Sequence, residues 1–355
     1  MKEKEKGIAN VTQLAEFDEI IDVRSPAEFA EDHVPGAVNC PVLDNEERIR
    51  IGTLHKQESP FAAKKAGAAL VARNIAAHLE QRFSERDRIW RPLIYCWRGG
   101  KRSGAFTHVL RQIGWDAQQL DGGYKAYRRH VIAKLEILPG RFSFRVVGGA
   151  TGSGKSHLLT ALATHGAQML DLEALAAHKG SVLGDLPDEA QPSQKMFDSL
   201  LLAALQRLDP ARPVFVEAES RKIGNLQIGD ALLDAMRASP CLRIEATTAA
   251  RVEFLLRDYA YFLADPARLL RQLDCLRGLQ SAETLARWRE LAERGEWPAL
   301  VGELLEQHYD VLYQRSQGGN YPQFAQAPRY ATDDLSPAGL ERLTKAILAT
   351  ELANK

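Results

Sequence analysis

Residues 149–156 have the sequence Gly-Ala-Thr-Gly-Ser-Gly-Lys-Ser, which matches the phosphate-binding loop pattern in full. An apolar run over residues 142–147 precedes the loop and a helix-compatible run over residues 156–162 follows it, as the pattern requires. The glycines let the backbone wrap around phosphates, the lysine supplies positive charge, and a serine hydroxyl at the last position can hold Mg²⁺. The motif therefore predicts a P-loop α/β domain. Its phosphate-binding candidates are Gly149, Thr151, Gly152, Ser153, Gly154, Lys155 and Ser156.

Acidic residues follow the next two apolar runs, where a P-loop domain places the carboxylate that organises a metal ion or a water molecule. Residues 167–172 and 213–216 are predicted strands, and the candidate acids are Asp171, Glu217 and Glu219. Glu217 and Glu219 alternate along the chain, so only one of them need face the site. The alternative, that these two residues are ordinary loop acids, remains open.

Cys96 stands between an apolar run, residues 91–95, and a glycine-bearing loop that opens a helix-compatible segment. In such a geometry successive backbone N–H groups point inward, and the helix N-terminus adds positive potential. This setting lowers the pKa of a thiol, so the sequence favours a reactive thiolate that takes up a chalcogen or a phosphate-like group. The alternative is a buried structural cysteine beside a basic turn. The catalytic candidates are Cys96, Arg98 and Arg102, and the other residues of the anion loop are Trp97, Gly99, Gly100, Lys101 and Ser103.

The N-terminal part of the chain alternates predicted strands and helices, which indicates a parallel sheet. Over about residues 10–130 it resembles the rhodanese fold. The matching residues are Asp22-Val23-Arg24, Glu28-Phe29, His33, Pro35-Gly36-Ala37, Asn39, the Cys96 loop and Leu120-Asp121-Gly122-Gly123-Tyr124. Five residues separate Cys96 from Arg102, one more than in the usual sulfurtransferase loop. The longer loop is similar to those of rhodanese-like phosphatases and arsenate reductases, which accommodate a tetrahedral anion, and it argues against plain cyanide-type sulfur transfer.

We therefore predict an α/β protein with two domains. The first is a rhodanese-like parallel-sheet domain over residues 1–135, and the second is a P-loop NTPase-like α/β domain over residues 136–355 with a helical C-terminal part. After a strand at residues 242–246, the pattern predicts helices at 248–275, 281–293, 297–314 and about 335–352.

Composition restricts the compartment and the partners of the chain. Its 355 residues have a formal net charge of zero, so any nucleic-acid footprint must be local. No apolar run approaches the ~20 residues that a membrane-spanning helix needs, and the charged residues 1–6 are unlike a signal peptide. The four cysteines are widely spaced, which argues against a disulfide framework, a zinc site or a metal cluster. These features favour a cytoplasmic protein without a membrane partner.

The pairing of a rhodanese-like segment with a P-loop resembles the tRNA 2-selenouridine synthase family. The motifs that carry this resemblance, across nearly the whole chain, lie in residues 95–104, 148–156, 172–181 and 216–224. The resemblance implies that selenium from selenophosphate replaces the sulfur of 2-thiouridine at the wobble position of tRNA. It also implies an S-geranyl-2-thiouridine intermediate made from geranyl diphosphate. The tRNA anticodon arm is then the partner, and an enzyme that produces selenophosphate is a further candidate partner.

The residue chemistry agrees with this hypothesis. Alkylation makes the thiouridine sulfur a better leaving group, and Lys155, Ser156 and the loop amides suit a departing diphosphate. As a thiolate, Cys96 would attack selenium to form a selenopersulfide or would assist displacement at C2 directly, while Arg98 and Arg102 hold phosphate. Two other hypotheses remain: an ATP-dependent tRNA sulfurtransferase or kinase, and a non-enzymatic rhodanese-like anion sensor coupled to an NTPase switch.

A basic stretch over residues 125–145 joins the two predicted domains and contains a single acid, Glu136. It is either a solvated linker helix or a surface that contacts the phosphate backbone of tRNA. Its position between two candidate anion sites favours the second interpretation. The tRNA-binding candidates are Lys125, Arg128, Arg129, Arg141 and Arg145.

Overall fold

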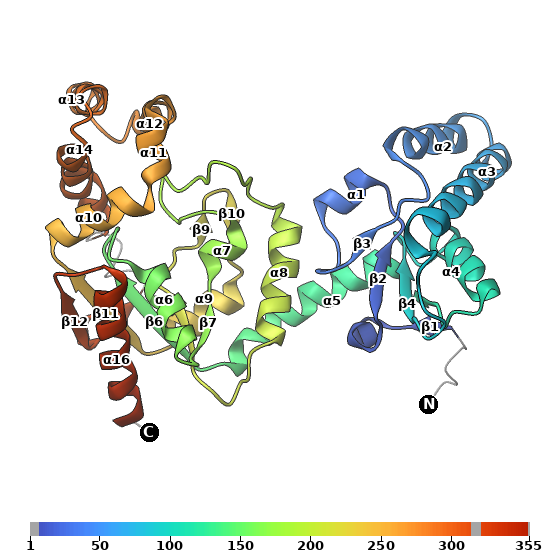
Figure 1. Cartoon of the computed structure of the whole chain (residues 1–355), viewed down its shortest axis with the longest axis horizontal. Helices are drawn as coiled ribbons and strands as arrows, with labels where there is room; N and C mark the ends of the chain where they lie inside the picture. Colours follow the sequence, from blue (N-terminus) through green and yellow to red (C-terminus); the bar gives the residue numbers. More distant parts are fainter. Residues whose placement is uncertain (1–6, 314–320, 354–355) are drawn as a thin grey trace. The chain divides into compact units, whose positions relative to one another are not determined.

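The computed structural model describes residues 7–313 and 321–353 (Figure 1). The chain divides into two compact units, of which the first comprises residues 1–134 with 198–203 and the second comprises residues 135–197 with 204–355. Each unit has its own parallel sheet and its own hydrophobic core, which confirms the predicted α/β class. Among the described residues, no helix has the length and apolar character needed to cross a bilayer.

The first unit is built around a five-stranded parallel sheet with the strand order β1-β5-β4-β2-β3. Its strands are β1 (Ile8–Ala9), β2 (Glu19–Asp22), β3 (Val38–Asn39), β4 (Pro92–Tyr95) and β5 (Gln118–Leu120). Its helices are α1 (Pro26–Glu31), α2 (Asn45–Gln57), α3 (Pro60–His78), α4 (Lys101–Ile113) and the start of α5 (Gly123–Ile137). Strand β4 is central and wholly buried, so Cys96 emerges at the middle of the carboxyl edge of the sheet.

Local capping explains where the helices of this unit begin. Helix α1 begins with Ser25 as its N-cap and Pro26 in its first turn, two residue types that are common at these positions. Helix α2 was not predicted, because none of its residues is buried and it lacks an apolar face. A capping box formed by Asp44 and Glu47 marks its start and is the signal that could have revealed it.

The second unit contains a five-stranded parallel sheet with the strand order β12-β11-β6-β8-β7. Its strands are β6 (Phe144–Gly149), β7 (Gln168–Leu170), β8 (Val214–Glu217), β11 (Cys241–Ala246) and β12 (Arg329–Thr332), and β9 (Lys222–Ile223) and β10 (Leu226–Gln227) form a separate hairpin. Because β6 is central and β8 lies beside it, the P-loop and Glu217 meet at the same edge of the sheet.

Strand β12 corrects the prediction that the chain is only helical after residue 246. It pairs in parallel with residues 243–246 of β11 at the edge of the sheet. Its four residues alternate between exposed and half-buried positions. The strand therefore lacks the apolar run that identifies a buried strand in a sequence.

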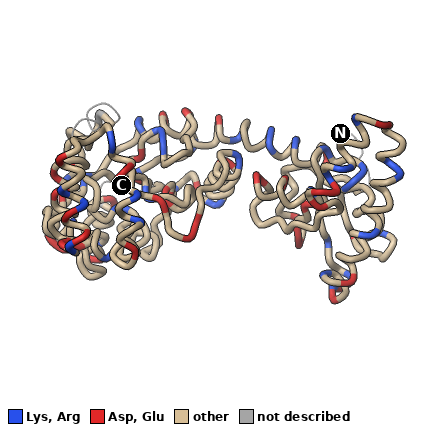
Figure 2. Tube along the Cα trace, turned by 90° about the horizontal axis from the view of Figure 1, so that it is seen from above, with Lys and Arg blue, Asp and Glu red and all other residues tan. Residues whose placement is uncertain are grey.

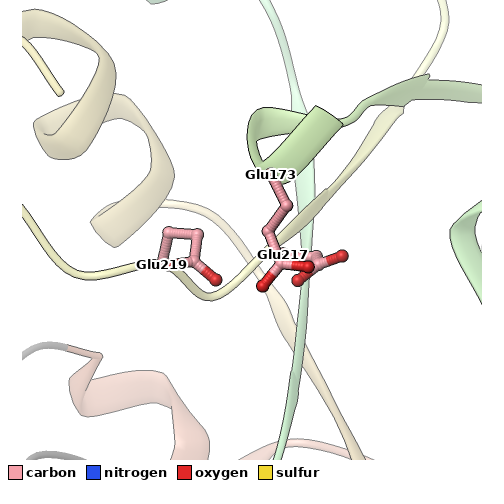
Figure 3. Close-up of side chains that lie close together, drawn as sticks. All are labelled: Glu173, Glu217 and Glu219. Carbon is pink, nitrogen blue, oxygen red and sulfur yellow. The ribbon is translucent and has the colours of Figure 1, made fainter. Parts of the chain in front are cut away.

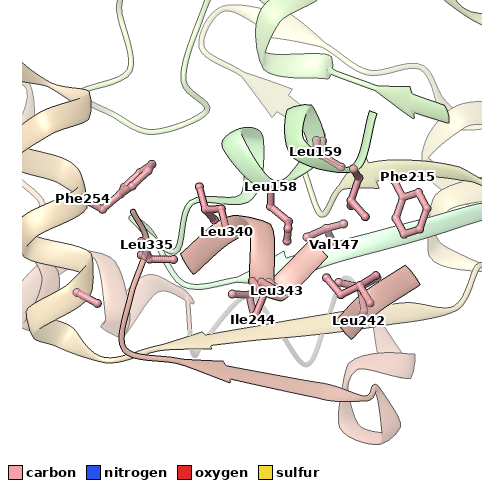
Figure 4. Close-up of a cluster of buried hydrophobic side chains, with 13 residues drawn as sticks. Val147, Leu158, Leu159, Phe215, Leu242, Ile244, Phe254, Leu335, Leu340 and Leu343 are labelled. Atoms are coloured by element: carbon pink, nitrogen blue, oxygen red, sulfur yellow. The ribbon is translucent and has the colours of Figure 1, made fainter. Parts of the chain in front are cut away.

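The helices of the second unit cover the sheet and continue into a layer of helices over residues 248–313, which we call the helical layer. They are α6 (Lys155–Thr164), α7 (Leu172–Ala176), α8 (Gln194–Gln206, whose residues 198–203 belong to the first unit), α9 (Asp230–Arg237), α10 (Thr248–Asp258), α11 (Ala260–Ala264), α12 (Pro266–Leu273), α13 (Ala282–Glu293), α14 (Trp297–Leu304) and α16 (Pro337–Ala353). Leucines of α6 and α16 pack with β6 and β11 in one buried cluster (Figure 4). The helical layer has its own core around the fully buried Trp288. Its predicted helices are confirmed as far as residue 313, except that the helix predicted over residues 248–275 is divided into α10, α11 and α12; residue 314 lies outside the described residues.

Candidate active sites

The P-loop turns sharply between β6 and α6. Gly152 and Gly154 have φ angles of +79° and +73°, in the left-handed region that favours glycine. A Cβ atom on Gly152 would also lie 2.8 Å from the side chain of Leu255. Lys155 Nζ donates a hydrogen bond to the Gly149 carbonyl oxygen (3.2 Å), which holds its charge at the loop. The candidate phosphate-binding residues thus form one cradle at the start of a helix.

Three carboxylates gather beside this cradle. Oxygen atoms of Glu173, Glu217 and Glu219 all lie within 4.8 Å of one another (Figure 3). The Ser156 hydroxyl at the end of the P-loop donates a hydrogen bond to Glu173 Oε2 (2.9 Å). We call these three glutamates the acid cluster.

The acid cluster corrects the expectation that only one of Glu217 and Glu219 need face the site. Strand β8 ends at Glu217, and the backbone N–H of Glu219 donates to the Glu217 carbonyl oxygen (2.8 Å). This turn ends the alternation of a strand, so both carboxylates reach the same place. Glu173 was not among the predicted acids, although it stands two residues after the candidate Asp171. Asp171 instead caps α7 by accepting a hydrogen bond from the Ala174 N–H (2.8 Å).

Burial raises the pKa of every carboxyl in the acid cluster, and the charge of Glu173 raises the pKa of Glu217 and Glu219 further. The Glu217 carboxyl is 1% exposed, and burial followed by the charge of Glu173 raises its pKa well above the usual value. Burial and Glu173 raise the pKa of Glu219 to about 7, and burial raises the pKa of Glu173. Lys155 opposes these shifts only in part. The cluster therefore retains protons near neutral pH when no cation compensates its charge.

The acid cluster fits a hard divalent cation. Carboxylate and hydroxyl oxygens are the ligands that Mg²⁺ prefers. Both Glu217 oxygens lack a hydrogen-bond partner within residues 7–313 and 321–353, and an unpaired buried carboxylate is unfavourable. Glu173, Glu217, Glu219 and Ser156 are accordingly the residues that could hold Mg²⁺ next to a phosphate on the P-loop.

A large cavity, which we call the P-loop cavity, opens around these groups. It contains about 1900 Å³ of empty space, open solvent included. The helical layer is tied to the P-loop at this cavity, because Arg251 Nε donates to the Thr151 carbonyl oxygen (2.8 Å). Arg251 is 5% exposed and its guanidinium binds both carboxylate oxygens of Asp310 (2.6 and 3.0 Å). This anchor links segments far apart in the chain, and no sequence motif marks it.

The Cys96 loop forms a second anion site, in the first unit. Cys96 is 3% exposed, and the Ser103 hydroxyl donates a hydrogen bond to its Sγ (3.1 Å). Burial opposes ionisation, but hydrogen bonds from Ser103, the charge of Arg102 and a hydrogen bond from the Gly100 backbone outweigh it and lower the pKa of the thiol. Residues 120–123 support the loop closely, since a Cβ on Gly99 would lie 2.6 Å from the Leu120 carbonyl oxygen. The geometry favours a reactive thiolate over a structural cysteine.

The three cations of the Cys96 loop differ in exposure and in pairing. Arg98 and Lys101 are exposed. Arg102 instead binds both carboxylate oxygens of Glu28 (2.9 and 3.4 Å) and is 17% exposed. Glu28 was noted in the sequence only as part of the rhodanese pattern. Trp97 packs against Tyr124 with ring centroids 5.2 Å apart, so it forms a wall of the loop.

Comparisons with known proteins find matches for both units of the chain. Residues 8–130 match the family model described as "Rhodanese-like domain", and residues 142–272 match the one described as "tRNA 2-selenouridine synthase AAA domain". The chain is 36% identical over 264 residues to the tRNA 2-selenouridine synthase of Nitrosomonas europaea, covering 73% of this chain and 68% of that protein. It is 34% identical over 333 residues to that of Cupriavidus necator, covering 84% of this chain and 88% of that protein. The chain belongs to the tRNA 2-selenouridine synthase family.

In this member of the tRNA 2-selenouridine synthase family, two arginines of the basic stretch form ion pairs that stabilise the fold. Arg128 pairs with Asp198, and Arg145 Nε pairs with Glu351 Oε2 (2.7 Å). Lys125, Arg129 and Arg141 are exposed. Basic and acidic residues are interspersed over both units (Figure 2). The exposed members of the stretch therefore remain the candidates for contact with RNA.

We expect Glu217→Gln to raise the thermal midpoint of this synthase family member at pH 8. Carboxyls whose folded pKa is raised stabilise the fold below their usual pKa, and this contribution is lost as the pH rises through the folded pKa, which is about 7 for Glu219. At pH 8, above the pKa of Glu219, the charge of Glu219 opposes ionisation of the buried Glu217 carboxyl, and an amide at position 217 removes this unfavourable interaction. A gain of roughly 1 kcal/mol corresponds to about 2–4 °C in a domain of this size.

Scanning calorimetry from pH 5 to pH 8, with and without MgCl₂, tests this prediction. MgCl₂ should raise the midpoint of the wild type at pH 8 more than that of Glu217→Gln. The exposed Glu253→Gln serves as the control and should leave the midpoint unchanged. A Glu217→Gln midpoint at pH 8 equal to or below that of the wild type would contradict the repulsion that we assign to the acid cluster.

Proposed function

We propose that this protein converts 2-thiouridine at the wobble position of tRNA into 2-selenouridine, with S-geranyl-2-thiouridine as the intermediate. The observation that carries the proposal is that a chain of this family contains both a thiol with a lowered pKa in a rhodanese-like loop and a P-loop beside three carboxylates. The first site suits selenium chemistry, and the second suits the release of a diphosphate. Geranyl diphosphate and selenophosphate are the proposed small-molecule substrates.

The first step belongs to the P-loop cavity. The thiouridine sulfur attacks C1 of geranyl diphosphate, a carbon–sulfur bond forms, the carbon–oxygen bond breaks, and diphosphate leaves. N3 of the base loses its proton, and the acid cluster provides carboxylates with raised pKa values that can accept it. Lys155 and the P-loop amides stabilise the negative charge that develops on the leaving oxygen. Mg²⁺, when bound, would neutralise further charge on the diphosphate.

The second step belongs to the Cys96 loop. The Cys96 thiolate adds to C2 of the S-geranyl base and becomes bonded to it. The bond between C2 and the geranyl sulfur then breaks, and geranyl thiolate leaves and takes a proton from water. Selenium of selenophosphate then displaces the thiolate at C2, and water cleaves the selenium–phosphorus bond to release phosphate. Selenium in selenophosphate already has the oxidation state it keeps in selenouridine, so this route needs no oxidant. A selenopersulfide on Cys96 would need one, and we therefore favour direct displacement between the two routes.

The remaining assignments follow from the same proposal. The exposed Lys125, Arg129 and Arg141 would contact the phosphate backbone near the anticodon arm of tRNA. Arg98 and Lys101 would contact the phosphate of selenophosphate, because they are the exposed cations of the Cys96 loop. A selenophosphate-producing enzyme is the proposed supplier of that substrate.

Mass spectrometry of wobble nucleosides tests the proposal in cells. A strain that lacks the gene should contain 2-thiouridine without its geranyl or selenium derivatives, and expression of this chain in a medium with selenium should restore 2-selenouridine. The absence of 2-selenouridine from cells that express this chain would contradict the proposed function. An unaltered 2-thiouridine pool together with RNA-stimulated ATP hydrolysis would favour the sulfurtransferase or kinase hypothesis instead.

A further inference from the structure

A second cavity of the second unit adjoins the P-loop cavity and has almost wholly apolar walls. It lies within the helical layer and contains about 600 Å³ of empty space, open solvent included. Its inner walls come from α11, α12 and α14, among them Phe262, Leu269, Trp297 and Leu300. We call it the apolar cavity. Ligand pockets are concave and lined mainly by apolar side chains with a few polar groups at one side, so a cavity of this kind suggests an apolar ligand.

The two cavities share one wall. Thr151 of the P-loop, Ser181, Leu255, Tyr259 and Tyr309 line both of them. Thr151, Ser181 and the two tyrosines give this wall its polar side-chain groups. A ligand that crosses the wall would therefore have a polar group on the P-loop side and a hydrocarbon group on the other side.

The apolar cavity is held in a fixed position relative to the P-loop. Arg251 and Leu255 lie one turn apart on α10, and both touch the P-loop. Arg251 Nε donates to the Thr151 carbonyl oxygen at 2.8 Å, and the side chain of Leu255 packs against Gly152. Because α10 also contributes to the wall of the apolar cavity, the head and the tail of one ligand can be positioned together.

We infer that the apolar cavity receives the hydrocarbon tail of geranyl diphosphate while the P-loop holds its diphosphate, and that the cavity walls set the chain length that is accepted. This inference rests on the proposed function and adds the place and the specificity of the prenyl group. A nucleotide does not fit the same arrangement, because the polar edges of its base would be buried without partners. An isoprenoid chain has no polar group to desolvate, and each buried methylene contributes favourably.

Titration calorimetry with MgCl₂ and three ligands tests the inference: geranyl diphosphate, farnesyl diphosphate and inorganic diphosphate. The wild type should bind geranyl diphosphate about tenfold more tightly than inorganic diphosphate. Val301→Phe places a larger side chain in the apolar cavity from α14. It should weaken the binding of geranyl diphosphate about tenfold and leave the binding of inorganic diphosphate unchanged. The matched control is Val311→Phe, because Val311 is 37% exposed and lines neither cavity.

A second variant keeps the test decisive if Val301→Phe folds poorly. Trp297→Leu enlarges the apolar cavity and should improve binding of farnesyl diphosphate relative to geranyl diphosphate by about threefold or more. Unchanged ligand preference in both variants, with geranyl diphosphate still bound by the wild type and lost in Lys155→Ala, would overturn the inference and leave the proposed function standing. No binding of geranyl diphosphate by the wild type would overturn the proposed geranyl transfer and this inference with it.

Discussion

We expect the Cys96→Ala protein to accumulate S-geranyl-2-thiouridine and to form 2-selenouridine at a rate reduced at least about 10³-fold. The thiol of Cys96 is the nucleophile of the proposed second step, and its pKa is lowered by hydrogen bonds from Ser103 and by the charge of Arg102 in spite of burial. The P-loop cavity lies in the other unit and is unaltered by this substitution. Liquid chromatography with mass spectrometry of nucleosides from tRNA treated in vitro provides the measurement.

Cys40→Ala is the matched control for this substitution. Cys40 lies in the same unit and is fully buried, and burial raises the pKa of its thiol to about 12, so it is not a nucleophile at neutral pH. The control should form 2-selenouridine normally. If Cys96→Ala also forms it at the wild-type rate, Cys96 has no part in the reaction.

We expect Lys155→Ala to leave 2-thiouridine unmodified, with geranyl transfer reduced about 10²–10³-fold. Lys155 Nζ is held at the Gly149 carbonyl oxygen and beside the acid cluster, where its charge can stabilise the departing diphosphate. The loop amides alone cannot replace a full positive charge in this acidic surrounding. The rate of S-geranyl-2-thiouridine formation from geranyl diphosphate and tRNA measures this effect.

Lys345→Ala is the control for Lys155→Ala, because Lys345 is an exposed residue of α16 that lines neither cavity. Its geranyl transfer rate should equal that of the wild type. Undiminished geranyl transfer by Lys155→Ala would remove the P-loop from this step.

Both anion loops could be predicted from the sequence because each is a local feature. The Cys96 loop and the P-loop lie between a strand and a helix that are adjacent in the chain, so spacing and residue type were sufficient. The parallel sheets followed from the alternation of such units. The confirmed parts of the fold are those that depend on short-range patterns.

The parts that were missed depend on contacts between distant segments. Glu173 follows β7, and it meets Glu217 only because β7 and β8 are neighbours in the sheet. Arg102 is paired with a glutamate 74 residues away, and Arg251 reaches a carbonyl oxygen 100 residues away. A short sequence pattern carries no information about such pairings. The edge strand β12 was missed for a different reason, since it has neither an apolar run nor a buried face.

If two separate sites perform two consecutive steps, tRNA that already carries S-geranyl-2-thiouridine needs only the second of them. Lys155→Ala, Cys96→Ala and the wild type are each given this RNA with selenophosphate, and 2-selenouridine is measured over time. We expect Lys155→Ala to form 2-selenouridine at close to the wild-type rate and Cys96→Ala to form none. Failure of Lys155→Ala on this RNA, or success of Cys96→Ala, would contradict the division of the reaction between the P-loop and Cys96.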